Sequence, residues 1–139
     1  WVDSGPATSG VASAPDFPAD MEGLSLPPFE RLAEQASIEG LSADALERFR
    51  ERAVSEPGTV IRQIVHLTND ARFDVPTTFV CCSMPSSQVM ELVKAGHPMF
   101  AEVADLKSVD YVDLPTGHWP MWSRPSDLAH ILASESSNN

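Results

Sequence analysis

The sequence predicts an α/β fold in which helices flank a parallel sheet. Two runs rich in β-branched and aromatic residues, 75–82 and 109–114, are separated and followed by segments of helical periodicity. The first run is apolar at nearly every position, which is typical of a strand buried on both faces of a parallel sheet. The order strand, helix, strand, loop, helix indicates this architecture, and 139 residues suffice for one domain or part of one.

The N-terminal part of the chain predicts an insertion rather than a core layer. Residues 1–3 form the end of a strand that enters a turn, and a loop rich in Pro, Ser, Gly and Ala follows. A short helix is expected after Pro27-Pro28, and a longer amphipathic helix begins at Ser42 and ends before Pro57. We therefore expect residues 14–57 to form a small, partly helical lid.

The C-terminal part predicts the helices that cover the sheet. Ser86 or Ser87 is expected to cap a helix that ends at Gly96. An amphipathic helix follows Pro125, and the polar residues 134–139 are expected to fray at its end.

Composition argues against several classes of partner. A net charge of −11, with nine basic residues scattered along the chain, disfavours nucleic acids and anionic lipid surfaces. No apolar run approaches the roughly 20 residues that cross a bilayer, and we expect no secretory leader, because no charged segment followed by an apolar one is found. The chain begins with Trp rather than Met. We therefore expect an internal fragment of a longer parent protein.

Cysteine and histidine spacing argues against a metal or cofactor. Cys81 and Cys82 are neighbours on a strand, so their side chains point to opposite faces and cannot easily form a bridge. Two buried thiols are typical of a reducing compartment, which predicts a cytoplasmic location. His66, His97 and His130 show no paired ligand spacing with the fourth histidine, so we expect no metal site and no cofactor.

That fourth histidine, His118, lies in a loop of unusual composition. The stretch LPTGHWPMWSRP, residues 114–125, places it shortly after the expected strand 109–114 and directly before Trp119, with Trp122 and the last helix following. Ligands gather at the carboxyl ends of parallel strands, so this position predicts a functional imidazole. Trp119, Met121 and Trp122 either pack the loop, which we favour, or contact a substrate.

These segments resemble the C-terminal half of an α/β-hydrolase. "DVPTTFVCCS" is similar to the penultimate strand, and "YVDLPTGHWPMWSRPSDLAHIL" to the last strand, the catalytic-histidine loop and the final helix. "WVDSGP" resembles the end of the preceding strand, with the lid inserted after it. The resemblance implies that residues 1–139 are the C-terminal portion of one such domain and that the first half of the fold is absent.

The resemblance also implies a Ser-acid-His triad, of which this chain supplies only a part. His118 would be the general base. The chain contains no Gly-x-Ser-x-Gly elbow, so its nucleophile is not recognisable and the fragment alone should be inactive. Asp3 matches the acid position used by some members of the family, and Asp113 or the absence of any acid are the alternatives.

Two functions follow from these observations. The first is a serine hydrolase, esterase-like, that acts on a small acyl substrate. The second is a noncatalytic remnant or binding module of the same fold that self-associates. In either case a sheet cut in its middle exposes an apolar edge, which predicts a second copy of the chain or a complementing N-terminal half as partner.

Overall fold

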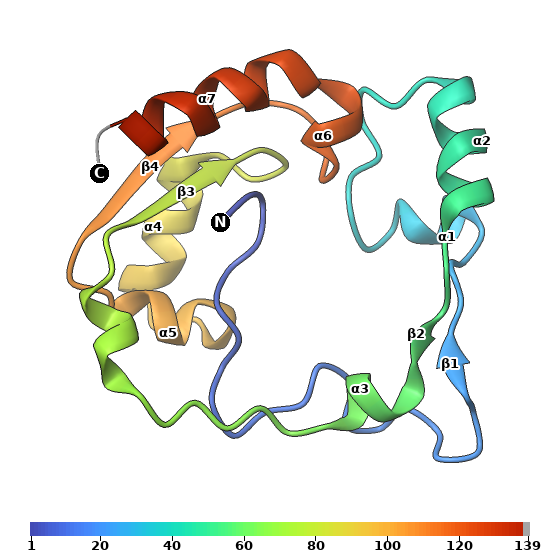
Figure 1. Cartoon of the computed structure of the whole chain (residues 1–139), viewed down its shortest axis with the longest axis horizontal. Helices are drawn as coiled ribbons and strands as arrows, with labels where there is room; N and C mark the ends of the chain where they lie inside the picture. The colour runs from blue at the N-terminus through green and yellow to red at the C-terminus, as the bar shows by residue number, and fades with distance from the viewer. Residues whose placement is uncertain (138–139) are drawn as a thin grey trace.

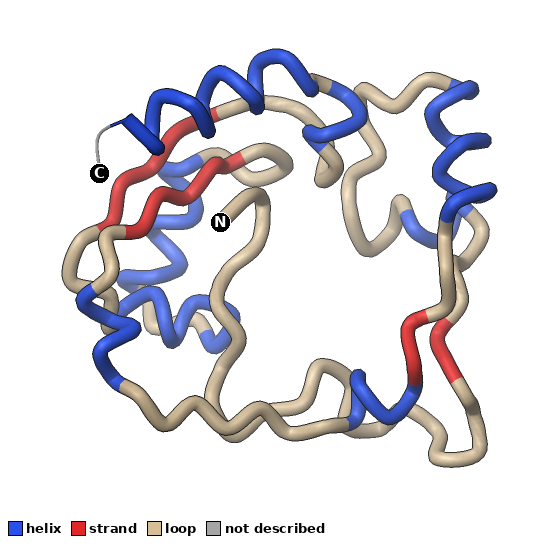
Figure 2. Tube along the Cα trace, viewed as in Figure 1, coloured by secondary structure: helices blue, strands red, loops and turns tan. Residues whose placement is uncertain are grey.

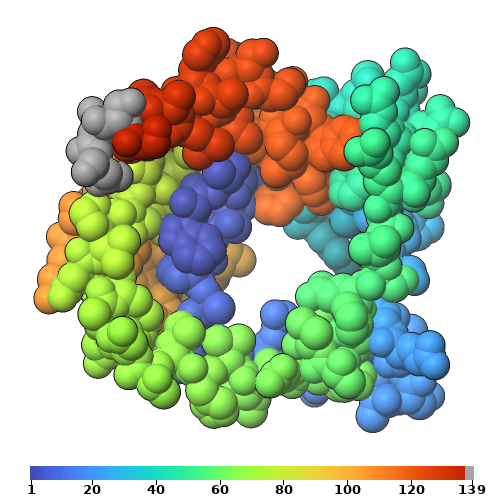
Figure 3. Space-filling view, in the orientation of Figure 1, coloured from blue at the N-terminus to red at the C-terminus, as the bar shows by residue number. Residues whose placement is uncertain are grey.

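The computed structural model describes residues 1–137 and forms a ring around a central opening (Figures 1 and 3). One side of the ring carries the larger sheet and its helices, and the opposite side carries the predicted lid. Figure 2 shows that long loops join the two sides. In chain order the elements are β1 (Gly23–Leu24), α1 (Phe29–Leu32), α2 (Ala43–Arg52), β2 (Glu56–Pro57), α3 (Gly58–Arg62), the 3-10 helix η1 (Asp70–Asp74), β3 (Thr77–Cys81), α4 (Ser86–Lys94), the 3-10 helix η2 (Pro98–Phe100), α5 (Ala101–Ala104), β4 (Val109–Asp113), α6 (Pro120–Ser123) and α7 (Pro125–Ser137).

The larger sheet confirms the predicted α/β class with parallel pairing. β3 and β4 pair in parallel from Thr77↔Val109 to Cys81↔Asp113. Val2 adds a parallel bridge to Val80 on the other edge of β3. The carboxyl ends of all three segments therefore lie at the same edge of the sheet.

Helices cover both faces of β3, as its apolar sequence predicts. Phe79 and Cys81 point toward α4 and α5, where they pack with Val89, Phe100 and Val103. The alternate residues Val80 and Cys82 point to the other face and pack with Leu114 and Leu128 of the α7 side. Cys81 and Cys82 are both free and buried on opposite faces, as predicted from their adjacency.

Helix ends agree with the sequence in two places and differ in two. Ser42 caps α2 through its side chain, which accepts a hydrogen bond from the Ala45 amide at 3.2 Å. Gly96 follows α4 with a φ of 68°, where glycine is favoured. Ser86 does not cap α4, because it is already the first helical residue. The prediction that residues 134–139 are frayed is wrong as far as Ser137, because α7 continues to that residue. Residues 138–139 lie outside the described part.

The predicted lid is anchored at its base by a strand pair that the sequence did not indicate. β1 and β2 pair antiparallel, Gly23 opposite Pro57, and so bring the two ends of residues 23–57 together. The lid contains α1 and α2, as expected, and Leu32 is its buried apolar residue. Among residues 1–137, no helix is long and apolar enough to cross a membrane.

Candidate functional site

The structure brings two residues of the predicted site into direct contact. His118 Nδ1 lies 2.7 Å from Asp3 Oδ2, although the residues are 115 positions apart in the chain. The Asp3 side chain is 5% exposed and that of His118 is 37% exposed, so the carboxylate is enclosed while the imidazole reaches solvent. An ionised carboxylate only accepts hydrogen bonds, so it holds the proton on Nδ1 and leaves Nε2 free to accept one.

Asp3 is held by a dense set of hydrogen bonds. Its Oδ1 accepts from the backbone amides of Cys82 and Ser83, both at 2.9 Å, and its Oδ2 accepts from the Ser83 hydroxyl at 2.6 Å. Burial alone would raise the pKa of Asp3, but the hydrogen bonds from Ser83, His118 and the two amides outweigh it, so the pKa lies below its ordinary value. The carboxylate therefore stays ionised in its enclosed position.

The backbone at Asp3 adopts an unusual conformation to make these contacts. Its φ is 44°, the only positive value for a non-glycine residue in the described chain. Aspartate and asparagine tolerate this left-handed region better than most residues because their short polar side chains bond locally. The turn directly after the sheet edge thus aims the carboxylate across the ends of β3 and β4.

The lid holds the His118 loop in place through backbone contacts. The His118 amide donates to the Ser37 carbonyl at 2.7 Å, and the Gly117 amide donates to the Glu39 carbonyl at 3.2 Å. A Cβ atom on Gly117 would lie only 2.6 Å from either carbonyl oxygen, so this close approach requires glycine. The position of the imidazole therefore depends on residues 37–39 of the lid.

The aromatic residues beside His118 pack between the loop and the lid. Trp119 meets the His118 ring edge-on, with centroids 4.9 Å apart, and also contacts Phe49 of α2 at 5.3 Å. Trp122 stacks on Phe49 at 6.1 Å, and Met121 is 48% exposed. None of these three residues lines the pocket that opens beside Asp3 and His118, the pair called the dyad below. The packing interpretation of the loop is thus the one the contacts favour.

The alternative acid, Asp113, is occupied elsewhere. Its Oδ1 accepts from the Ser86 amide and its Oδ2 from the Ser86 hydroxyl, both at 2.7 Å. It thereby satisfies the first amide of α4, a role that the sequence interpretation gave to a serine. Of the two aspartates considered, Asp3 is the one in contact with His118.

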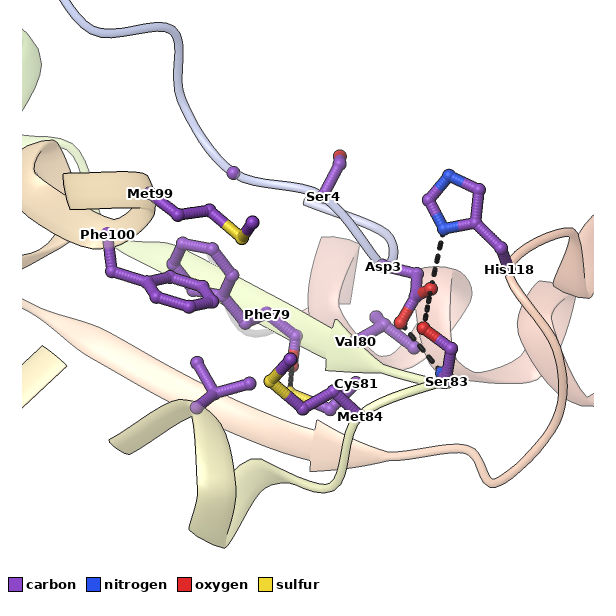
Figure 4. A pocket seen from close by; sticks show the side chains of 12 residues that line it. Asp3, Ser4, Phe79, Val80, Cys81, Ser83, Met84, Met99, Phe100 and His118 are labelled. Carbon is purple, nitrogen blue, oxygen red and sulfur yellow. Dashed lines mark hydrogen bonds and ion pairs between the residues drawn. The ribbon is translucent and has the colours of Figure 1, made fainter. Parts of the chain in front are cut away.

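A pocket of about 200 Å³ opens beside the dyad (Figure 4). Sequence reasoning missed most of its lining, including Ser83 and the apolar residues from β3, α4 and η2. Ser83 carried a usable signal, because it follows β3 at the edge where the strand ends meet. The lining residues are Asp3, Ser4, Gly5, Phe79, Val80, Cys81, Ser83, Met84, Val89, Met99, Phe100 and His118.

Other reactive side chains do not form a second centre among residues 1–137. His97 Nδ1 accepts the Met99 amide at 3.2 Å, which is a capping role. Burial raises the pKa of Cys81 and of Cys82 to about 11, so both thiols stay protonated and weakly nucleophilic. In this part of the chain no three His, Cys, Asp or Glu residues are grouped to hold a metal ion.

Comparisons of the chain with protein-family models, with curated proteins and with solved structures found no match.

Proposed function

We propose that this chain is the C-terminal part of an α/β-hydrolase domain and supplies the base and the acid of a serine hydrolase acting on small acyl esters. The observation that carries the proposal is the 2.7 Å contact between His118 Nδ1 and the buried Asp3 carboxylate. A buried carboxylate that orients an exposed imidazole is the arrangement that activates a serine hydroxyl.

The placement of the dyad supports the fold assignment. Asp3 and His118 both follow parallel strand segments, and the loop that carries the histidine leads into the final described helix. In open α/β sheets, reacting groups gather at this edge. The ordering acid before histidine along the chain agrees with the α/β-hydrolase triad.

In each half of the reaction His118 first accepts a proton and then donates it. His118 Nε2 takes the serine proton as the hydroxyl oxygen attacks the ester carbonyl, and Asp3 stabilises the imidazolium. The imidazolium then gives this proton to the departing alkoxide, which leaves an acyl-serine. In the second half, His118 Nε2 takes a proton from a water molecule as the water oxygen attacks the acyl carbon. The bond between that carbon and the serine oxygen then breaks, His118 returns the proton to the serine oxygen, and the carboxylic acid departs. No cofactor takes part.

The serine must come from polypeptide outside these residues, because the chain has no Gly-x-Ser-x-Gly elbow. The structure leaves room for such a partner. The segment 1–3 pairs with β3 on one side, and Trp1 at the sheet edge is 51% exposed. We propose that a complementing N-terminal half, or a second copy of the chain, covers this edge.

A fluorophosphonate probe tests the proposed activity in the full-length protein encoded by the natural reading frame. We expect a serine within Gly-x-Ser-x-Gly, N-terminal to residue 1, to be labelled. His118→Ala should slow labelling by at least about a hundredfold, the typical contribution of a general base. The matched control is His97→Ala, which removes a capping imidazole outside the dyad and should label at the wild-type rate.

The noncatalytic alternative is the outcome if labelling fails. A natural chain that begins near residue 1, or a full-length protein that the probe does not modify, would leave a binding module of the same fold. Sedimentation of the 139-residue chain adds to this test. We expect self-association through the exposed sheet edge, and a compact monomer with a sharp melting transition would contradict the proposed partner surface.

A further inference from the structure

The pocket beside the dyad has two chemically different ends. Asp3, Ser83 and His118 gather at one end, whereas Phe79, Met99 and Phe100 lie at the other (Figure 4). The apolar wall is well ordered by the core, since Phe79 is 3% exposed and Phe100 is 8% exposed. A ligand that fits both ends must be polar at one end and apolar at the other.

The size of the pocket limits the ligand. Its volume of about 200 Å³ is below the range of roughly 300–1,000 Å³ that is usual for drug-sized ligands. The apolar end is lined by thioether and aromatic groups from Met84, Met99 and Phe100, which adapt to short alkyl chains and stack on small aryl rings. The pocket therefore has room for a single ring or a short chain.

The charge of the pocket disfavours anions. Asp3 is ionised at the polar end, and the chain carries a net charge of −11. The pocket lining contains no Lys or Arg that would pair with a carboxylate ligand. An anion placed beside Asp3 would be repelled, whereas an uncharged hydroxyl, ester or amide can hydrogen-bond at this end.

We propose that this pocket binds uncharged esters or alcohols that carry one short alkyl or aryl group, with the polar end at the Asp3–His118 dyad and the apolar end against Met99 and Phe100. The inference deepens the proposed function, since the pocket opens on the same dyad. Binding and hydrolysis are separable, because binding is measured on the 139-residue chain without a nucleophile.

The five methionines of the chain provide an internal test. With ¹³C-methyl-methionine labelling, benzyl acetate should shift the signals of Met84 and Met99, which line the pocket, in a saturable manner. Met21, Met90 and Met121 do not line it and should not shift. Phenylacetate, of similar size but negatively charged, should bind at least about tenfold more weakly.

A pair of exposed methionines gives matched variants that leave the buried core unchanged. Met99 is 65% exposed and Met121 is 48% exposed. Met99→Ala removes part of the apolar wall and should weaken benzyl acetate binding by about five- to tenfold. Met121→Ala should leave the affinity unchanged.

Three outcomes would overturn the inference: no saturable shift at Met84 and Met99, equal shifts at the three control methionines, or equal binding of phenylacetate. The proposed function stands or falls separately. Saturable binding without fluorophosphonate labelling would support the proposed pocket ligand and contradict the proposed hydrolase activity. Labelling without binding would support the activity and contradict the proposed ligand.

Discussion

Asp3 and Asp113 lie at the carboxyl ends of two strand segments that flank β3, and both are bound by a serine in the same way. Each accepts the amide and the hydroxyl of one serine, Ser83 in the first case and Ser86 in the second. Only Asp3 also contacts an imidazole. The Asp3 side chain is 5% exposed, whereas Asp113 is an exposed residue.

The difference between the two aspartates arises from what surrounds them. Asp113 accepts hydrogen bonds from Ser86, the first residue of α4, so its role is to cap that helix. The left-handed backbone at Asp3 points its carboxylate toward the loop after β4. The lid holds that loop through hydrogen bonds to the Ser37 and Glu39 carbonyl oxygens. A serine–carboxylate pair is thus a structural unit, and it becomes a candidate catalytic unit only where an imidazole also contacts the carboxylate.

The largest expected effect separates the two aspartates by activity. In the proposed full-length hydrolase, Asp3→Asn should lower kcat by roughly 10³–10⁴-fold, because an amide no longer holds the proton on Nδ1 of His118. Asparagine also tolerates the positive φ, so the backbone should be retained. Asp113→Asn should lower kcat by less than about fivefold. Steady-state kinetics on an aryl ester would check both, and the reverse order would contradict the assignment of Asp3.

The second effect tests whether the lid positions the histidine. Gly117→Ala places a Cβ atom 2.6 Å from the Ser37 and Glu39 carbonyl oxygens, so the loop must move. We expect a loss of about 1–3 kcal/mol in the free energy of unfolding. We also expect the proton between His118 Nδ1 and Asp3 to give a low-field NMR signal in the wild type, and this signal should disappear in the variant.

Gly58→Ala is the matched control for this variant. A Cβ atom there would lie equally close, 2.6 Å from the Met21 carbonyl oxygen, but at the strand pair at the base of the lid. It should destabilise the chain by a similar amount and retain the low-field signal. Loss of the signal in both variants would show that general destabilisation, and not the loop contact, controls the dyad.

A smaller effect is expected at the second aspartate. Asp113→Ala removes both hydrogen bonds to Ser86 and leaves the first amide of α4 without its side-chain partner. Losing a helix cap costs about 1 kcal/mol in the free energy of unfolding. Denaturant unfolding measures this loss. An unchanged denaturant midpoint would show that water replaces the carboxylate without a loss in the free energy of unfolding.

The smallest effect is a dependence on pH. The native pKa of Asp3 lies below its ordinary value, so the native state binds fewer protons than the unfolded state at acidic pH. Its stabilising contribution is complete above about pH 4–5 and is lost as the pH falls through the native pKa. The stability difference between wild type and Asp3→Asn should therefore shrink on acidification, and a constant difference would contradict the shift.

Much of the sheet side could be predicted from the sequence, because local signals and packing agree there. The apolar run of β3 indicated burial on both faces, and the residue pattern located His118 at the sheet edge. Asp3 was predicted only through a resemblance and with Asp113 as its rival, because nothing local distinguishes two aspartates at strand ends.

The features that could not be predicted depend on contacts between distant segments. The pairing of Gly23 with Pro57 involves only two residues on each side, too few to leave a pattern in the sequence. The cap on α4 comes from Asp113, 27 positions away from Ser86. Local sequence around the helix start therefore predicted a serine cap in place of this aspartate. The pocket lining combines β3, α4 and η2, and only their packing brings it together.

The wide spacing of Asp3 and His118 in the chain determines when their contact can form during synthesis. His118 emerges from the ribosome 115 residues after its carboxylate, so the acid–base pair forms only after the lid and both strands have been made. A shorter nascent chain carries Asp3 without its imidazole partner. The contact between the two side chains would then report that the chain has been made at least as far as the loop after β4.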